Sequence, residues 1–206
     1  MRAVALCLLL LTIHGHRIMA QSMADVFKDS CSITWIGLDF SKAKLVPDTA
    51  FAEMEMDARS MLHKWNTLLE KEPEKFDLGG ALRSMRCTTN TSFVLDVNNV
   101  VTPGDLLGRE NYALDKELVP GMVRAYPTTG EGLGVVFIVS TFDKSRHTAE
   151  FYVTFFNMAT KEVLLSDRVY GKPIGFGLRN YWAGAVYSAL KKIKATHSRV
   201  WRNRYK

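Results

Sequence analysis

Three β-type segments in a row, followed by an amphipathic helix, constrain the fold of this chain more than any other feature. Residues 134–142, 149–156 and 163–170 are rich in Val, Phe, Ile and Tyr, and polar or Gly/Pro residues separate them. This composition is typical of β-strands. The connections at 143–148 and 157–161 are short, so each strand should pair with the next one. The sequence therefore predicts a three-stranded antiparallel meander.

The segment after the meander predicts a helix with one buried face. Apolar pairs recur every four residues between Tyr181 and Ile193, which is the spacing of side chains on one face of a helix. Residues 183–185 are the small residues Ala, Gly and Ala. We therefore expect this helix to lie close to the sheet.

The rest of the chain supplies further strands and helices. Residues 32–40 form a two-faced apolar run that suits an interior strand, and residues 91–97 predict another strand. Residues 50–70, 78–86 and 109–126 predict helical regions, because apolar side chains recur there at three- and four-residue steps. Together these elements predict an α/β fold, an α+β sandwich in which helices pack against a mixed sheet of about five strands.

The first twenty residues predict a secretory signal peptide. A short basic start precedes the apolar run 3–13, which is too short to span a bilayer, and Ala20 supplies a small residue before a cut. No later segment of the sequence reaches the ~18 apolar residues of a membrane helix. We therefore expect residues 21–196 to form a single exported domain, secreted or periplasmic, whose oligomeric state the sequence does not indicate.

The basic charge of the chain is concentrated at its C-terminus. The sequence holds 27 Lys and Arg against 21 Asp and Glu. Seven of the basic residues lie in residues 191–206 and two in the predicted signal peptide, so residues 21–190 carry 18 basic and 21 acidic residues, a net charge of −3. This balance does not favour a nucleic-acid-binding face on the domain.

We interpret residues 197–206 as a solvated, frayed basic tail. In the alternative interpretation the tail touches phosphate groups or an anionic membrane surface, and Trp201 and Tyr205 are its stacking groups.

Two cysteines, Cys31 and Cys87, follow the predicted signal peptide. In an oxidising compartment they could form one disulfide, which would close a long loop and contribute roughly 4 kcal/mol in the chain-entropy model. The other interpretation is two buried free thiols. The sequence leaves both open.

The start of the last helix is the main candidate for a ligand site. Glycine-rich residues 175–177 precede a first turn that holds Arg179 and Asn180, and Trp182 follows. Free backbone N–H groups and the helix dipole both favour an anion at such a position. We interpret these three side chains as binding residues for a small anionic ligand. Alternatively, the glycines only permit a tight turn and Arg179 pairs with an acid such as Asp167.

Asp39 is a second candidate, because it lies near the end of the strand predicted at 32–40 and α/β folds place ligand groups at strand ends. The simpler interpretation is that its carboxylate accepts hydrogen bonds from the backbone of the following Ser41 and Lys42.

The sequence contains no nucleophile elbow, phosphate-binding glycine loop, zinc-ligand spacing or HExxH motif. We therefore predict no catalytic residue, no metal and no cofactor. The expected function is an envelope-associated binding or assembly accessory protein, whose partner is another envelope protein or a small anionic ligand. The alternative is a small secreted hydrolase with a site built from Asp39 and the helix start at Arg179.

Two segments carry a family resemblance. Ile33-Thr-Trp-Ile-Gly-Leu-Asp-Phe40 and Gly175-Phe-Gly-Leu-Arg-Asn-Tyr-Trp-Ala-Gly184 together resemble small, uncharacterised secreted proteins of bacterial envelopes. More loosely, the hairpin at 152–166 with its closing helix is similar to the α/β periplasmic domains of envelope-assembly lipoproteins of the curli-secretion type, although the lipid-anchor cysteine is lacking. The resemblance implies an envelope location and an α/β fold, and it carries over no catalytic residue.

Overall fold

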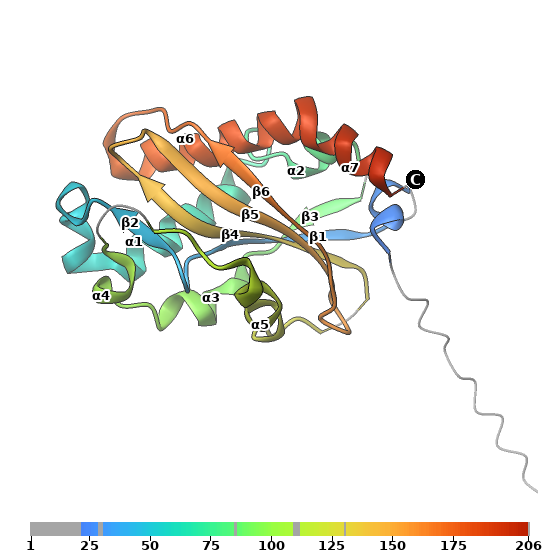
Figure 1. Ribbon diagram of the computed structural model, residues 1–206, viewed down its shortest axis with the longest axis horizontal. Helices are drawn as coiled ribbons and strands as arrows, with labels where there is room; N and C mark the ends of the chain where they lie inside the picture. The colour runs from blue at the N-terminus through green and yellow to red at the C-terminus, as the bar shows by residue number, and fades with distance from the viewer. Residues whose placement is uncertain (1–21, 29–30, 85, 109–111, 130, 206) are drawn as a thin grey trace, which may run out of the picture.

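One mixed β-sheet forms the centre of the molecule (Figure 1). The computed structural model describes residues 22–28, 31–84, 86–108, 112–129 and 131–205, so the predicted signal peptide lies outside the described residues. The six strands are β1 (Ile33–Asp39), β2 (Lys44–Val46), β3 (Cys87–Thr89), β4 (Leu133–Asp143), β5 (Thr148–Asn157) and β6 (Val163–Gly171). Their order is β3-β1-β4-β5-β6, and the short β2 pairs with the end of β4 beyond β1.

The sheet has a parallel and an antiparallel half that meet at β4. β4, β5 and β6 are antiparallel neighbours, which confirms the predicted meander. β1 runs parallel to both β3 and β4, so it is the interior strand that its two apolar faces predicted. β4 is buried along its whole length, because it is covered on both faces and paired along both edges.

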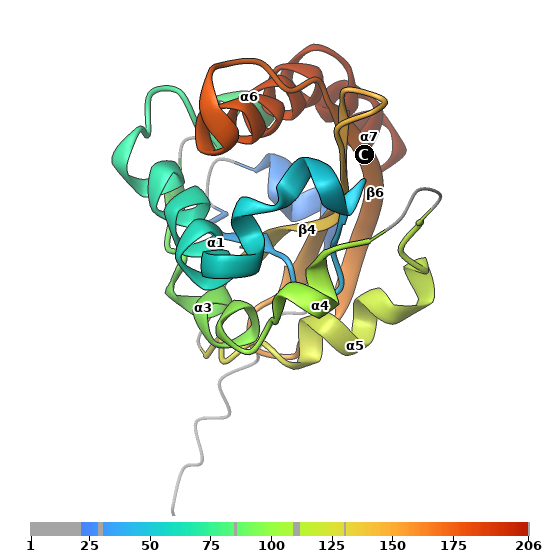
Figure 2. The same ribbon diagram turned by 90° about the vertical axis from the view of Figure 1, so that its left-hand side faces the viewer.

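Helices cover both faces of the sheet. The larger layer holds α1 (Glu53–Lys71), α2 (Leu78–Leu82), α6 (Gly177–Lys192) and α7 (Ser198–Arg204), and the smaller one holds α3 (Ser92–Asn99) and α5 (Val119–Arg124). α4 (Pro103–Leu106) contacts β2. Figure 2 shows α6 and α5 on opposite sides of the molecule with β4 between them. The predicted α/β architecture of helices packed around a mixed sheet is therefore confirmed.

The larger core is built around aromatic rings. Trp182 of α6 stacks on Phe142 of β4, with ring centroids 4.5 Å apart and planes at 5°. Trp65 of α1 meets the same phenylalanine edge-on at 5.3 Å. All three side chains are buried. Offset and edge-to-face ring pairs add to the stability gained from buried area, so these rings fix α1 and α6 against the sheet.

α6 approaches the sheet as closely as its small residues predicted. A Cβ added to Gly171 of β6 would lie 2.0 Å from the carbonyl oxygen of Ala185 in α6. On the same helix, a Cβ added to Gly184 would lie 2.0 Å from the carbonyl oxygen of Ile174. Only glycine tolerates such contacts between backbones.

The strand predicted at residues 91–97 is wrong, because this segment forms α3. Asn90 forms a turn just before the N-cap Thr91: its side chain accepts hydrogen bonds from the Ser92 backbone at 3.1 Å and from the Ser92 hydroxyl at 2.7 Å. Phe93, Val94 and Val97 then share the face that packs into the smaller core. A short apolar run of this kind is compatible with the spacing of a helix and with that of a strand. The side-chain hydrogen bonds of the preceding polar residues favour the helix.

The predicted frayed tail is also wrong for residues 198–204. The chain continues from α6 through a π-helical turn (Ile193–His197) into α7. Trp201 of α7 is fully buried, and its indole N–H donates to the carboxylate of Asp167 at 2.7 Å. The fold therefore does not end at residue 196, and this tryptophan is not available as a stacking group.

The helices predicted at 50–70 and 78–86 correspond to α1 and α2. In the region 109–126 the helix is short: a 3-10 turn (Lys116–Leu118) leads into α5, and Pro120 lies in its first turn. Cys31 and Cys87 are both free thiols. Among the described residues, no helix combines the length and the hydropathy that a membrane span requires.

Candidate functional site

The candidate site lies at the connection between β6 and α6. Gly175 and Gly177 have φ values of 132° and 71°, which favour glycine. They turn the chain so that the Ile174 N–H donates to the Tyr181 carbonyl at 3.2 Å. α6 then begins without a side-chain cap. The first N–H groups of the helix have no partner within it, so they are available to an anion.

A cavity of about 320 Å³ opens at this helix start. Tyr181 and Trp182 come from α6, Lys144 from the turn between β4 and β5, and Glu53 from the start of α1. Phe176, which is 95% exposed, forms part of its edge. Segments far apart in the sequence thus meet at one end of the molecule, and they bring together one basic, one acidic and several aromatic side chains.

Tyr181 connects the hairpin turn to the helix. The Lys144 ammonium lies 3.7 Å from the centre of the tyrosine ring, a cation–π geometry. His147, in the same turn, has its Nδ1 2.7 Å from the tyrosine hydroxyl. Both contacts hold the β4–β5 turn against α6, so the Lys144 charge is kept at the cavity.

Trp182 also lines the cavity. Its side chain is fully buried, yet its indole N–H has no hydrogen-bond partner among the residues that the structure describes. Most buried N–H groups in proteins are paired, so an unpaired one calls for an explanation. The indole nitrogen has almost no solvent-accessible surface, so a ligand in the cavity would reach it only after a local rearrangement.

Arg179 and Asn180 do not line the cavity, unlike the predicted role of both. They are exposed and hydrogen-bond to each other, Nε to Oδ1 at 3.1 Å. Arg179 contributes its carbonyl instead, which accepts from the Trp65 indole at 2.9 Å. The alternative pairing with Asp167 is not formed; that carboxylate accepts from the Trp201 indole and lies 3.6 Å from His197 Nδ1.

Asp39 lies deep in the smaller core. Its side chain is only 1% exposed and accepts two hydrogen bonds, from the Tyr126 hydroxyl at 2.5 Å and from the Ser41 N–H at 2.7 Å. The second bond is the turn contact that the simpler interpretation predicted. Burial raises the pKa of the Asp39 carboxyl above its usual range, and it raises the pKa of Tyr126 well above the usual value.

The hydrolase site predicted from Asp39 and Arg179 is not assembled. Asp39 points to Tyr126 in the smaller core, whereas Arg179 contacts Trp65 of the larger core, so the sheet separates them. The part of the chain that the structure describes also holds no group of three or more His, Cys, Asp or Glu side chains arranged for a metal ion.

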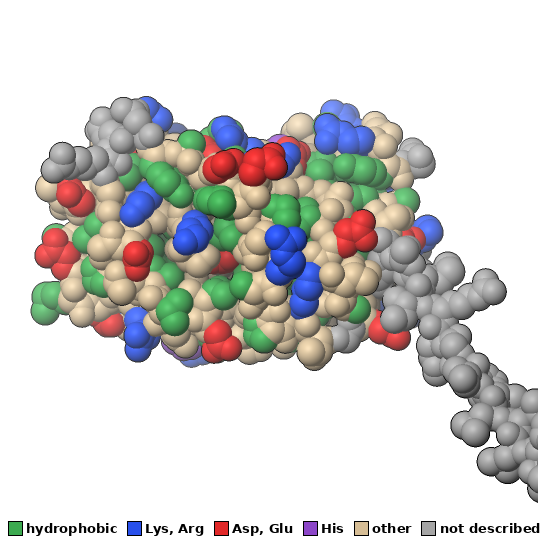
Figure 3. All heavy atoms as spheres, turned by 60° about the horizontal axis from the view of Figure 1, so that its bottom comes forward, with side chains coloured by type: hydrophobic (Ala, Val, Ile, Leu, Met, Phe, Trp, Pro, Cys, Tyr) green, Lys and Arg blue, Asp and Glu red, His purple; other side chains and the backbone are tan. Residues whose placement is uncertain are grey.

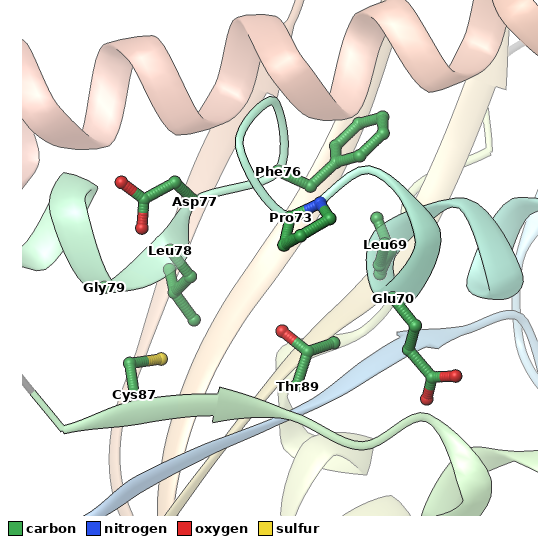
Figure 4. A pocket seen from close by; sticks show the side chains of 9 residues that line it. All are labelled: Leu69, Glu70, Pro73, Phe76, Asp77, Leu78, Gly79, Cys87 and Thr89. Carbon is green, nitrogen blue, oxygen red and sulfur yellow. The ribbon is translucent and has the colours of Figure 1, made fainter.

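Another cavity, of about 460 Å³, lies between the end of α1, α2 and the edge strand β3 (Figure 4). Its polar side chains already have structural roles. Glu70 accepts from the backbone and hydroxyl of Thr91 at 2.7 and 2.8 Å, and Asp77 caps α2 through Gly80 at 2.7 Å. Burial raises the pKa of the Cys87 thiol to about 12, which makes it a poor nucleophile. We therefore assign no ligand to this cavity.

Comparison with known proteins gives no match: no family model, no curated protein and no solved structure is similar to this chain. The geometry at the start of α6 is thus the basis on which a function is argued.

Proposed function

We propose that this protein is an exported, non-catalytic binding protein of the cell envelope, and that it binds a small anionic ligand in the cavity at the start of α6. The observation that carries the proposal is the group of donors there. The uncapped N-terminus of α6 and the Lys144 ammonium belong to one cavity of about 320 Å³. Both favour negative charge.

The acidic residue in the cavity narrows the ligand class. Glu53 lines the same space as Lys144, and it would repel a second negative group on the ligand. A ligand with one carboxylate or phosphate group and with hydroxyl or amino donors suits this pair better than a polyanion does. The aromatic rings of Phe176 and Tyr181 offer flat apolar surface to the rest of the molecule.

The described residues around this cavity form no assembled nucleophile and base, which supports binding over catalysis. A hydrolase needs a positioned nucleophile or general base within hydrogen-bond reach of its substrate. Glu53 lines the cavity, but it is an exposed carboxylate at the start of α1. The Nδ1 of His147 is engaged with the Tyr181 hydroxyl at 2.7 Å in an exposed turn. We therefore propose no reaction at this site.

The envelope location rests on the N-terminal sequence and on the resemblance to secreted envelope proteins. It is tested by fractionating cells that produce the full chain and determining the N-terminus of the product. We expect a periplasmic or secreted product that starts near Gln21. Recovery of the uncut chain in the cytosol would refute this part of the proposal.

Ligand binding is tested by calorimetry on the chain from residue 21 at low ionic strength. The probes are gluconate, a carboxylate with several hydroxyl groups, and inorganic phosphate. Lys144→Met should weaken binding by about 10- to 100-fold, the range of a charge-assisted hydrogen bond. Arg179→Met is the matched control, because it removes an equally exposed charge at the same helix start from outside the cavity.

The two variants separate the cavity from the general charge of this end of the molecule. Equal loss in both would mean that non-specific attraction holds the probe. No loss in Lys144→Met would refute the cavity as the binding site.

A further inference from the structure

An apolar cavity of about 360 Å³ lies on the opposite side of the sheet from the α6 site, between the end of α3 and α5. Its walls are apolar, with Val97 and Val100 on one side and Leu118 and Met122 on the other. A volume near the lower end of the range for small-molecule sites suits a small ligand. Its chemistry therefore differs from that of the donor-rich α6 site.

The mouth of this cavity carries apolar side chains that have no protein cover. Val100 is 76% exposed and Leu118 is 46% exposed. Figure 3 views this side of the molecule, where hydrophobic side chains lie interspersed with charged groups of both signs. Single exposed apolar residues need no explanation. Here, however, the two flank the opening of an apolar cavity, so an apolar ligand would bury them together.

The polar side chain at the floor of the cavity is already satisfied by hydrogen bonds within the protein. Asp39 lies there, but both of its carboxylate oxygens already accept hydrogen bonds, from Tyr126 and from Ser41. Burial also favours the neutral form of this carboxyl. The deep end of the cavity is thus suited to a hydrocarbon chain.

The rim of the cavity carries a basic side chain. Lys42 lines the cavity and is exposed, and the described residues place no carboxylate within ion-pair distance of its ammonium. Its charge acts on Asp39 and Asp105 only from a longer distance. An exposed cation at the mouth of an apolar cavity complements a ligand with an anionic head and an apolar tail. Lysine side chains commonly hold their charge at the water boundary while their stems line apolar surface.

We propose that the α3–α5 cavity binds a linear amphiphile, a medium-chain fatty acid or a molecule with the same head and tail chemistry. The alkyl chain lies between α3 and α5, and the carboxylate meets the Lys42 ammonium at the rim. This site is independent of the α6 cavity, because the sheet lies between them.

Gly121 provides a selective block. It lines the cavity in α5, and a Cβ added there meets no heavy atom within 4 Å. Gly121→Leu should therefore fill the mouth without a clash, and it replaces a poor helix former with a good one. Gly104→Leu in α4 is the matched control, since a Cβ there meets only the Thr102 hydroxyl at 3.8 Å, outside the cavity.

The probe is decanoate, titrated into the chain from residue 21 below its micelle concentration, with octanoate and decanol for comparison. Affinity should change about fourfold per methylene. Gly121→Leu should weaken decanoate binding at least tenfold, with a Tm equal to or above that of the wild type. Gly104→Leu should bind as the wild type does. Lys42→Met should remove the preference for decanoate over decanol.

Three outcomes would overturn the proposal. One is no binding of decanoate at millimolar concentration, and another is binding that Gly121→Leu leaves unchanged. The third is concentration-dependent dimerisation of the wild type that Gly121→Leu abolishes in light scattering, because the cavity would then belong to an interface between two copies of the chain.

Discussion

The anchoring of the C-terminal segment by Trp201 makes a sharp prediction. Its ring is fully buried and meets Phe155 of β5 edge-on, with centroids 5.4 Å apart. Its indole N–H donates to Asp167 of β6 at 2.7 Å. Trp201→Ala would remove the ring contacts, leave a cavity in the larger core and break this hydrogen bond. Replacement of a buried tryptophan by alanine costs about 3–5 kcal/mol.

That cost can be divided between the ring and the hydrogen bond. Trp201→Phe keeps an aromatic ring but removes the N–H donor to a carboxylate. A hydrogen bond to a charged group contributes about 1.5–3 kcal/mol. The side chain of Asp167 is 34% exposed, so water replaces part of the lost bond and we expect the lower end of that range. The phenylalanine variant should therefore lose less stability than the alanine variant.

The assay is thermal and urea unfolding of the chain from residue 21. For a protein of this size 1 kcal/mol corresponds to about 2–4 °C in Tm, so Trp201→Ala should lower the Tm by about 6–20 °C. Val200→Ala is the control, because this neighbour is 42% exposed and should change stability by less than ~0.5 kcal/mol. A Tm of Trp201→Ala within about 2 °C of the wild type would show that the segment is a loose tail after all.

Two further predictions concern buried titratable groups. The pKa of the Asp39 carboxyl is raised above 3.8 in the folded protein. Above pH 3.8 the folded chain therefore keeps a proton that the unfolded chain releases. The contribution of Asp39 to the free energy of unfolding must then fall as the pH rises. Asp39→Asn should flatten this decline in a pH series of urea unfolding, and an unchanged pH dependence would contradict the burial argument. Cys87, with a pKa of about 12 against an ordinary 9.0, should form roughly a thousandfold less thiolate than a free thiol at pH 8. Its labelling by iodoacetamide, followed by mass spectrometry under native conditions, should be correspondingly slow, and fast labelling would refute it.

The elements of this fold that could be predicted from the sequence are those whose own residues show a clear strand or helix pattern. The meander and α6 were predictable, because long apolar runs and a four-residue repeat identify strands and helices without reference to the rest of the chain. β2 and β3 have three residues each, too few to show any period. They exist as strands because β4 and β1 offer them partners.

The candidate site shows the same limit. Glycines before a helix predicted a ligand site at the start of α6, and a cavity of about 320 Å³ opens there. Lys144 was not predictable, because it belongs to a hairpin turn that only the tertiary fold brings to Tyr181. Arg179 looked like the obvious cation, but its position in the helix turns it away from the cavity that Trp182 lines. Sequence spacing identified the helix start, and packing decided which side chains face it.

The position of β4 has a consequence for how the protein folds. This strand pairs with β1, β2 and β5. More than ninety residues separate the end of β1 from the start of β4. A nascent chain that has not yet reached residue 133 therefore has no partner for the inner edge of its first strand. Such long-range pairing makes folding slow, since loop closure must come before the contacts that reward it. The N-terminal half therefore cannot complete its part of the sheet before the C-terminal half has been made.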